Sequence, residues 1–127
     1  MRMSETSFEK LSVYKVAEQL VDSLWNIIIS WKPFERDTIG KQLVIAVDSV
    51  GANIAEGSGR YSDTDNRRFI RIARGSLYET IHWLRRSYKR NLLSEEQKHI
   101  VANDIQNLTK LLAGYLRSLN KKVDAKK

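Results

Sequence analysis

Apolar residues recur at helical spacing along almost the whole chain, in four blocks that short polar connections separate. Within each block they return every three or four residues, so they share one face of an α-helix. The only proline, Pro33, lies in a connection and ends a block, because proline disfavours the helical region for the residue before it. The pattern predicts four helices, at about residues 12–31, 37–56, 62–90 and 94–120, and loosely held tails at 1–11 and 121–127.

Two of the predicted helices have recognisable start signals. Ser62 is a good N-cap, and Asp63 and Asp65 after it suit the positive end of a helix dipole. The run Ser94-Glu95-Glu96-Gln97 matches a capping box. Because short connections make consecutive helices antiparallel, the sequence predicts an all-α, up-down-up-down four-helix bundle in a single domain of 127 residues.

The charge balance bounds the partners of such a domain. Lysine and arginine exceed aspartate and glutamate by 22 − 15 = 7, which permits binding to nucleic acid, anionic lipid or an acidic protein. The absence of cysteine excludes disulfides and thiolate zinc sites. The longest apolar run, Leu24 to Trp31, is far too short to span a bilayer, and residues 1–11 do not resemble a signal peptide, so we expect a cytoplasmic protein.

The first block has more apolar surface than one small bundle needs. Tyr14, Val21 and Trp25 lie to one side of its core stripe and widen the apolar arc. This width predicts contact with another copy of the chain. The alternative is a generous core that leaves a tryptophan exposed.

A basic stripe follows the third predicted helix. At 100° per residue, its members fall within about 60° of Arg67, while the apolar side chains fall on the far side. The stripe comprises Arg67, Arg71, Arg74, Tyr78, His82, Arg85 and Lys89. Cations spaced by one helical turn with an interleaved tyrosine can contact successive phosphates and stack on a base, so the stripe predicts binding of RNA or DNA. The alternative is a solvated face, or one paired with acids from other helices or other subunits.

Small and polar residues mark the end of the second predicted helix. Ser49, Asn53 and Glu56 share one face, and small residues beside them let another backbone approach. We expect Gly57 and Gly59 to supply the positive φ that ends a helix.

A metal site and an enzyme are both disfavoured. Glu79-x-x-His82 and Glu96-x-x-His99 match the spacing of di-iron bundles, but both pairs lie away from the apolar faces and at different levels of the bundle. The chain has no glycine-rich phosphate loop after a strand and no obvious Ser-His-Asp arrangement. We therefore expect no catalytic residues, no metal and no cofactor.

Two motifs in order resemble the four helix bundle protein family, also called 23S rRNA-intervening sequence proteins. The first is Gln42-x-x-x-Ala46 followed by Ser49-x-x-x-Asn53-Ile54-Ala55-Glu56-Gly57 and Arg60, and the second is Phe69 with Ala73-x-Gly75-Ser76-Leu77-x-Glu79. An upstream Phe8-x-x-Leu11-x-Val13-Tyr14 is similar to the opening signature of the family. The resemblance covers about residues 8–120.

The resemblance implies an all-α subunit that assembles into a ring-shaped homopentamer. Related accessory proteins of diversity-generating retroelements are basic pentamers that bind nucleic acid and a reverse transcriptase. No catalytic residues are carried over. The resemblance therefore implies a non-enzymatic oligomeric accessory protein; the alternative is a protein-interaction scaffold with no direct role in nucleic-acid binding.

The motif residues suit a role in packing. We expect Ser49, Asn53 and Glu56 to lie against a matching set on the third helix, with Asn53 and Ser76 joined in a polar network. The two glutamates of these sets would repel each other unless Arg60 or another cation lies between them. The matching set is Gly75, Ser76 and Glu79.

Overall fold

The structure is a computed structural model that describes residues 3–126, and within this range the chain is helical with no β-strand. Four helices are long: α1 (Ser12–Ile28), α3 (Lys41–Ser58), α4 (Asp63–Lys89) and α5 (Glu95–Ala125). Three short turns complete the order: the 3₁₀ turn η1 (Phe8–Lys10), the α-helical turn α2 (Pro33–Glu35) and the π-helical turn η2 (Arg36–Gly40). The all-helical fold class is confirmed.

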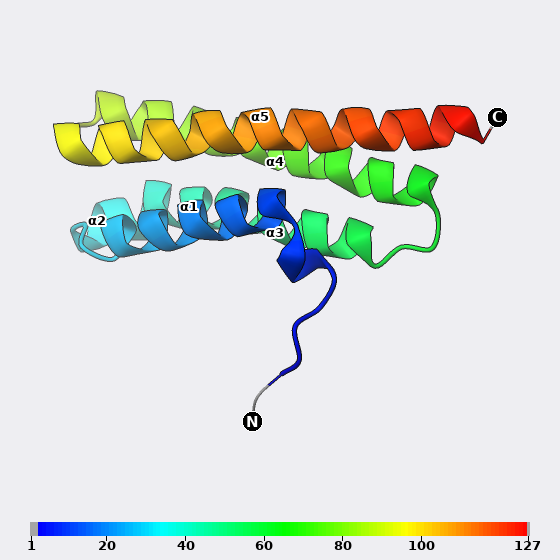
Figure 1. Ribbon diagram of the computed structural model, residues 1–127. Coiled ribbons are helices and arrows are strands. Elements are labelled where there is room, and N and C mark those ends of the chain that lie inside the picture. Colours follow the sequence, from blue (N-terminus) through cyan, green and yellow to red (C-terminus); the bar gives the residue numbers. More distant parts are fainter. Residues whose placement is uncertain (1–2, 127) are drawn as a thin grey trace.

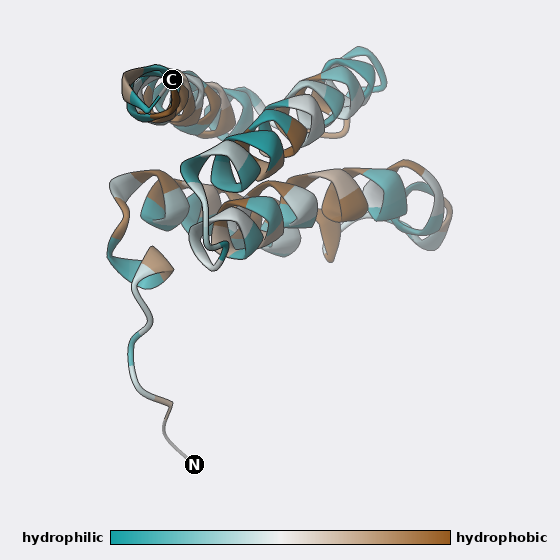
Figure 2. Ribbon diagram, turned by 90° about the vertical axis from the view of Figure 1, so that its right-hand side faces the viewer, coloured by the Kyte–Doolittle hydropathy of each residue, from teal (hydrophilic) through white to brown (hydrophobic). Residues whose placement is uncertain are grey.

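The long helices form two layers, with α1 and α3 in one and α4 and α5 in the other (Figure 1). Helix α3 packs against α4, and α1 packs against both α3 and α5. Seen from the side, brown apolar segments of the ribbon face the space between the layers (Figure 2). The two layers therefore meet through apolar faces.

One hydrophobic cluster runs through all four long helices. Its fully buried side chains are mostly leucine and isoleucine, and burial of each stabilises the fold by about 1.5–3 kcal/mol. The largest of them include Leu20, Leu24, Leu43, Ile54, Ile70, Leu77, Leu108, Leu112 and Leu119.

Both predicted helix starts are confirmed. The Ser62 hydroxyl accepts a hydrogen bond from the Asp65 amide at 3.1 Å. At the start of α5, the Ser94 hydroxyl accepts from the Gln97 amide at 3.1 Å, and the Gln97 side chain accepts from the Ser94 amide at 2.9 Å. This reciprocal pair is a complete capping box.

The connection between α1 and α3 differs from the prediction. Helix α1 ends at Ile28, short of the predicted Trp31, where the Ser30 hydroxyl donates to the Ile27 carbonyl at 2.6 Å. Helical backbone resumes at Pro33, earlier than the predicted residue 37, because proline is well suited to the first position of a helix. The indole of buried Trp31 donates to the Leu92 carbonyl at 2.9 Å and so joins this connection to the one between α4 and α5.

The predicted tails are more ordered than expected. Helix α5 continues to Ala125, with Val123 buried, and the Lys126 ammonium forms an ion pair with Asp63. At the other end, the Phe8 ring contacts the Tyr14 ring edge-on at a centroid distance of 4.9 Å. The prediction of loose tails is wrong where apolar side chains reach the bundle; residues 1, 2 and 127 lie outside the described range.

Within residues 3–126, no helix combines the length and the apolarity needed to cross a bilayer.

Candidate nucleic-acid interface

The basic stripe of α4 lies along the side of this helix nearer α5. Its residues are spaced by three, four or seven positions and so recur on one face over most of the helix. The buried residues of α4, such as Ile70, Leu77 and Leu84, occupy the inward face, which keeps most of the stripe outside the core. The exposed members are Arg71, Arg74, Tyr78, His82, Arg85 and Lys89.

Arg67 differs from the other members of the stripe. Its guanidinium Nη1 donates to the Asn120 side-chain oxygen on α5 at 3.2 Å. Its Nε is buried and has no hydrogen-bond partner within residues 3–126. Helix α5 therefore covers the beginning of the stripe, and the exposed part starts at Arg71.

Within residues 3–126, the exposed cations of the stripe have no acidic partners. Among the described residues, no carboxylate lies within ion-pair distance of Arg71, Arg74, Arg85 or Lys89. The predicted alternative of pairing with acids from other helices of the same chain is therefore not what the described residues show. Over the described range, these four cations on one helix face therefore lack ion-pair partners.

Two ring systems interrupt the cations. Tyr78 is 58% exposed, so its face is open to a stacking partner. The His82 ring instead contacts Trp83 edge-on, with a centroid distance of 4.8 Å and an interplanar angle of 72°. Tyr78 is thus the stripe residue best placed to stack on a base or sugar.

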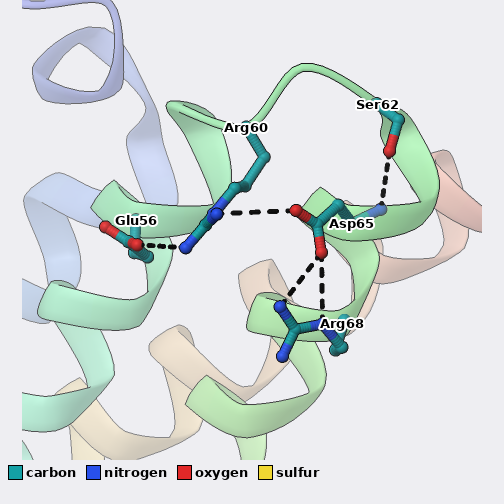
Figure 3. A network of polar contacts seen from close by, with 5 residues as sticks. All are labelled: Glu56, Arg60, Ser62, Asp65 and Arg68. Atoms are coloured by element: carbon teal, nitrogen blue, oxygen red, sulfur yellow. Dashed lines mark hydrogen bonds and ion pairs between the residues drawn. The ribbon is translucent and has the colours of Figure 1, made fainter.

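Arg60 joins the end of α3 to the start of α4 through an ion-pair network (Figure 3). Its guanidinium pairs with Glu56 and approaches Asp65 at 3.7 Å, and Arg68 pairs with the same Asp65 at 3.1 Å. Both guanidiniums also lie over the Phe69 ring, at 4.6 and 4.5 Å from its centroid. Arg60 thus holds the α3–α4 corner, and cation–π contact adds to the ion pairs.

The predicted packing of the two motifs across α3 and α4 is wrong in its details. The Asn53 side chain donates to the Ser49 carbonyl of its own helix at 2.7 Å, and among the described contacts it has none with Ser76. Gly75 is exposed, and a Cβ at this position would meet nothing within 4 Å. Glu79 is exposed as well and accepts a hydrogen bond from the Trp83 indole at 3.4 Å. Polar and small residues that share one face of a helix do not necessarily contact the neighbouring helix. The packing of all the helices in the bundle decides whether that face points inward or toward solvent.

The glycines at the end of α3 do not have the predicted backbone conformation. No glycine within residues 3–126 has a positive φ; Gly59 has φ −82°. Gly57 is instead buried, and the close approach of α4 leaves little room for a side chain, since a Cβ there would lie 3.0 Å from the Phe69 Cβ. The positive φ belongs to Asn91, at 57°, where the Leu92 amide donates to the Ser87 carbonyl and ends α4 in a Schellman motif.

The Glu-x-x-His pairs do not form a cluster. In the described part of the chain, no group of three or more carboxylate and histidine side chains could hold a metal ion. Glu79, His82, Glu96 and His99 are all exposed.

The sequence does not predict the surface between α4 and α5. Ile81 and Tyr88 on α4 and Ala102 and Ile105 on α5 line a groove there. Ile81 and Tyr88 are seven residues apart, which is a helical spacing, but the sequence gives no indication that α5 leaves these side chains partly uncovered.

The fold defines the class of protein: an all-α bundle of four long helices. The chain belongs to the 23S rRNA-intervening sequence protein family, whose profile matches residues 9–114. A solved structure with the same fold is a protein of unknown function from the S23 ribosomal protein family of Bacteroides thetaiotaomicron VPI-5482. It has a TM-score of 0.76 and 24% sequence identity, and the alignment covers 83% of this chain and 95% of that one. A search of curated proteins found no match.

Proposed function

We propose that the protein is a non-enzymatic accessory protein that binds RNA or DNA through α4, without strong sequence specificity. The observation that carries this proposal is the row of exposed, unpaired cations Arg71, Arg74, Arg85 and Lys89 beside the exposed Tyr78. From Arg71 to Lys89 the helix rises roughly 27 Å. A stacked strand advances about 3.4 Å per nucleotide, so this length corresponds to roughly eight nucleotides.

The chemistry of the row favours phosphates over base edges. Phosphate contacts position a protein on nucleic acid but carry no sequence information. A row of flexible cations therefore supports affinity that depends on charge and on salt, whatever the sequence bound.

The proposed assembly is a homo-oligomer of up-down-up-down bundles, and a pentamer by resemblance to the family. An exposed apolar patch supports self-association: Trp25, Ile29 and Ile45 are each more than half exposed, and together with Val44 they line a shallow groove between α1 and α3. Apolar patches of this kind commonly mark protein interfaces. A ring would present several copies of the α4 surface to one polyanion and so raise its avidity.

The same patch supports a second candidate function, a protein-interaction scaffold. In that case the apolar patch would contact a protein partner, such as a reverse transcriptase by resemblance to the retroelement accessory proteins. The basic surface would then dock an acidic partner or one that carries nucleic acid.

Binding of mixed-sequence RNA and DNA across a range of salt concentrations tests the first proposal. Each phosphate neutralised on a single strand adds about −0.7 to the log–log salt slope, so four contacts predict a slope of about −3. The double variant Arg71→Glu/Arg74→Glu is expected to lower the affinity and halve the slope.

A matched control is Lys10→Glu/Lys15→Glu, which reverses two exposed charges on η1 and α1, away from the groove between α1 and α3. Both double variants have the same net charge, 7 − 4 = +3. Equal losses in the two variants would show that net charge and not the α4 row drives binding. No binding at ~0.15 M salt, where specific phosphate contacts retain affinity, would favour the scaffold.

A further inference from the structure

A groove of about 440 Å³ lies between α4 and α5. Its lining is mainly apolar, with three polar groups: the Arg85 guanidinium, the Tyr88 phenol and the Gln106 amide. Pockets that bind small planar ligands commonly have this composition, because apolar walls hold the ring faces and a few polar groups contact the edges. The lining residues are Ile81, Leu84, Arg85, Tyr88, Ala102, Ile105 and Gln106.

The groove is continuous with the basic row of α4. Arg85 belongs to both, and Tyr78, Ile81, Arg85 and Tyr88 follow one another at spacings of three and four residues along the side of α4 nearer α5. A strand whose phosphates contact the row therefore runs along the edge of the groove. Its bases can then turn toward α5 into the groove.

The Tyr88 side chain is suited to line a groove that holds a base. Its ring is half-buried, and burial raises the pKa of its phenol, against the opposing effect of the positive charge of Arg85. The phenol therefore stays neutral at physiological pH. Its hydroxyl makes no hydrogen bond to any residue within 3–126, so it is free to donate to or accept from a ligand. The Lys98 ammonium lies 6.0 Å from the ring centroid and forms an ion pair with Glu95 at 3.0 Å.

We propose that this groove holds an unpaired base of a single-stranded nucleic acid whose phosphates contact the α4 row. The inference rests on the proposed function and adds a substrate class to it: single-stranded over double-stranded nucleic acid. In a duplex the bases are stacked and paired, so a duplex can offer phosphates to the row but no base to the groove. Stacking and apolar contact with a base add affinity that phosphates alone do not provide.

Three probes of equal length separate the contributions of base and phosphate: a single-stranded RNA of mixed sequence, the same strand with abasic sugars, and its duplex. Loss of one base contact corresponds to about a five- to hundredfold change in affinity. At equal salt we expect the abasic strand, which loses the base in the groove and any base stacked on Tyr78, to bind more weakly than the intact strand by at least fivefold, with a similar salt slope. The duplex should show binding by phosphates alone.

The variant Ala102→Leu obstructs the groove without changing the charge. Its matched control is Ala52→Leu, at an exposed position of α3. Circular dichroism and the oligomeric state establish that both variants fold and assemble as the unmodified chain does. We expect Ala102→Leu to weaken binding of the intact single strand by fivefold or more and to leave binding of the duplex and the abasic strand unchanged. Ala52→Leu should change none of the three.

Equal affinity for the intact and abasic strands, or no effect of Ala102→Leu on the intact strand, would overturn the groove inference while leaving phosphate binding by the row in place. Absence of binding to all three probes would overturn the proposed function, and this inference with it.

Discussion

The same substitution, glycine to alanine, is expected to have opposite effects at two positions. Gly57, in the last turn of α3, is buried against α4: a Cβ there would lie 2.5 Å from the Asn66 side-chain oxygen, 3.0 Å from the Phe69 Cβ and 3.1 Å from the Asn66 carbonyl oxygen. Gly75, in the middle of α4, is exposed, and a Cβ there would meet nothing within 4 Å. The pair therefore separates helix propensity from close packing.

Helix propensity and packing together determine how much each substitution changes the free energy of unfolding. Replacing a helical glycine by alanine stabilises the helix by about 1 kcal/mol where nothing clashes, so Gly75→Ala should raise the free energy of unfolding by about that amount. At Gly57 the methyl group would press against the main chain of α4, and the Asn66 amide cannot swing away freely because it donates to the Tyr115 hydroxyl at 3.2 Å. Such overpacking costs about 1–3 kcal/mol, which outweighs the gain in propensity. Because both variants gain the same propensity, we expect Gly57→Ala to be less stable than Gly75→Ala by the cost of overpacking, about 1–3 kcal/mol.

Urea unfolding followed by circular dichroism measures both free energies. The midpoints should move in opposite directions while the slopes stay constant. Measurement at two protein concentrations shows whether assembly contributes to either value. Equal stability of Gly57→Ala and Gly75→Ala would show that close packing against α4 does not constrain position 57. A loss of stability in Gly75→Ala that depends on protein concentration would instead place Gly75 in a contact between subunits.

Three further variants test the core, a connection between helices and the apolar patch. Asp104 is buried, one of its carboxylate oxygens has no hydrogen-bond partner within residues 3–126, and burial raises its pKa above the ordinary 3.8. Because its pKa is raised in the folded state, protonation of Asp104 favours folding, so the stability associated with this group is greatest below pH 3.8 and is lost as the pH rises through the folded pKa. Asp104→Asn should therefore raise the free energy of unfolding at pH 7 by about 1 kcal/mol and have less effect at acid pH. An equal effect at both pH values would contradict this. Trp31→Phe removes the hydrogen bond to the Leu92 carbonyl and should lower the free energy of unfolding by about 1–3 kcal/mol in urea titrations, whereas a change below the error would show that the bond contributes little. Trp25→Ser should reduce the assembled mass in light scattering without lowering helicity, and an unchanged mass would place the subunit contacts elsewhere.

Much of the fold follows from local sequence. Periodicity and capping residues identified the four long helices, because apolar spacing and orphan amides at helix starts are local properties. The boundaries were less accurate where tertiary contacts extend or interrupt a helix. Helix α5 continues to Ala125 because Val123 is buried against the bundle, and α1 stops at Ile28 where Trp31 turns toward Leu92.

The candidate site could be predicted only in part. Helical spacing predicts that the members of the basic stripe share one face of α4, and all of them except Arg67 are exposed. The same spacing gave no means of distinguishing Arg67, which α5 covers, from Arg71, which stays exposed, because exposure depends on the neighbouring helix. The α4–α5 groove could not be predicted for the same reason: Tyr88 and Ile105 belong to separate helices, and only their packing leaves a space between them.

The glycines show the same division between local and tertiary information. The sequence by itself determined that a flexible, small residue stands at positions 57, 59 and 75. Only the tertiary structure decided that Gly57 serves close packing against α4, that Gly75 faces outward and that the left-handed turn belongs to Asn91. Periodicity fixes which residues share a face of one helix; the direction in which that face points is decided by how all four long helices bury their apolar surfaces together.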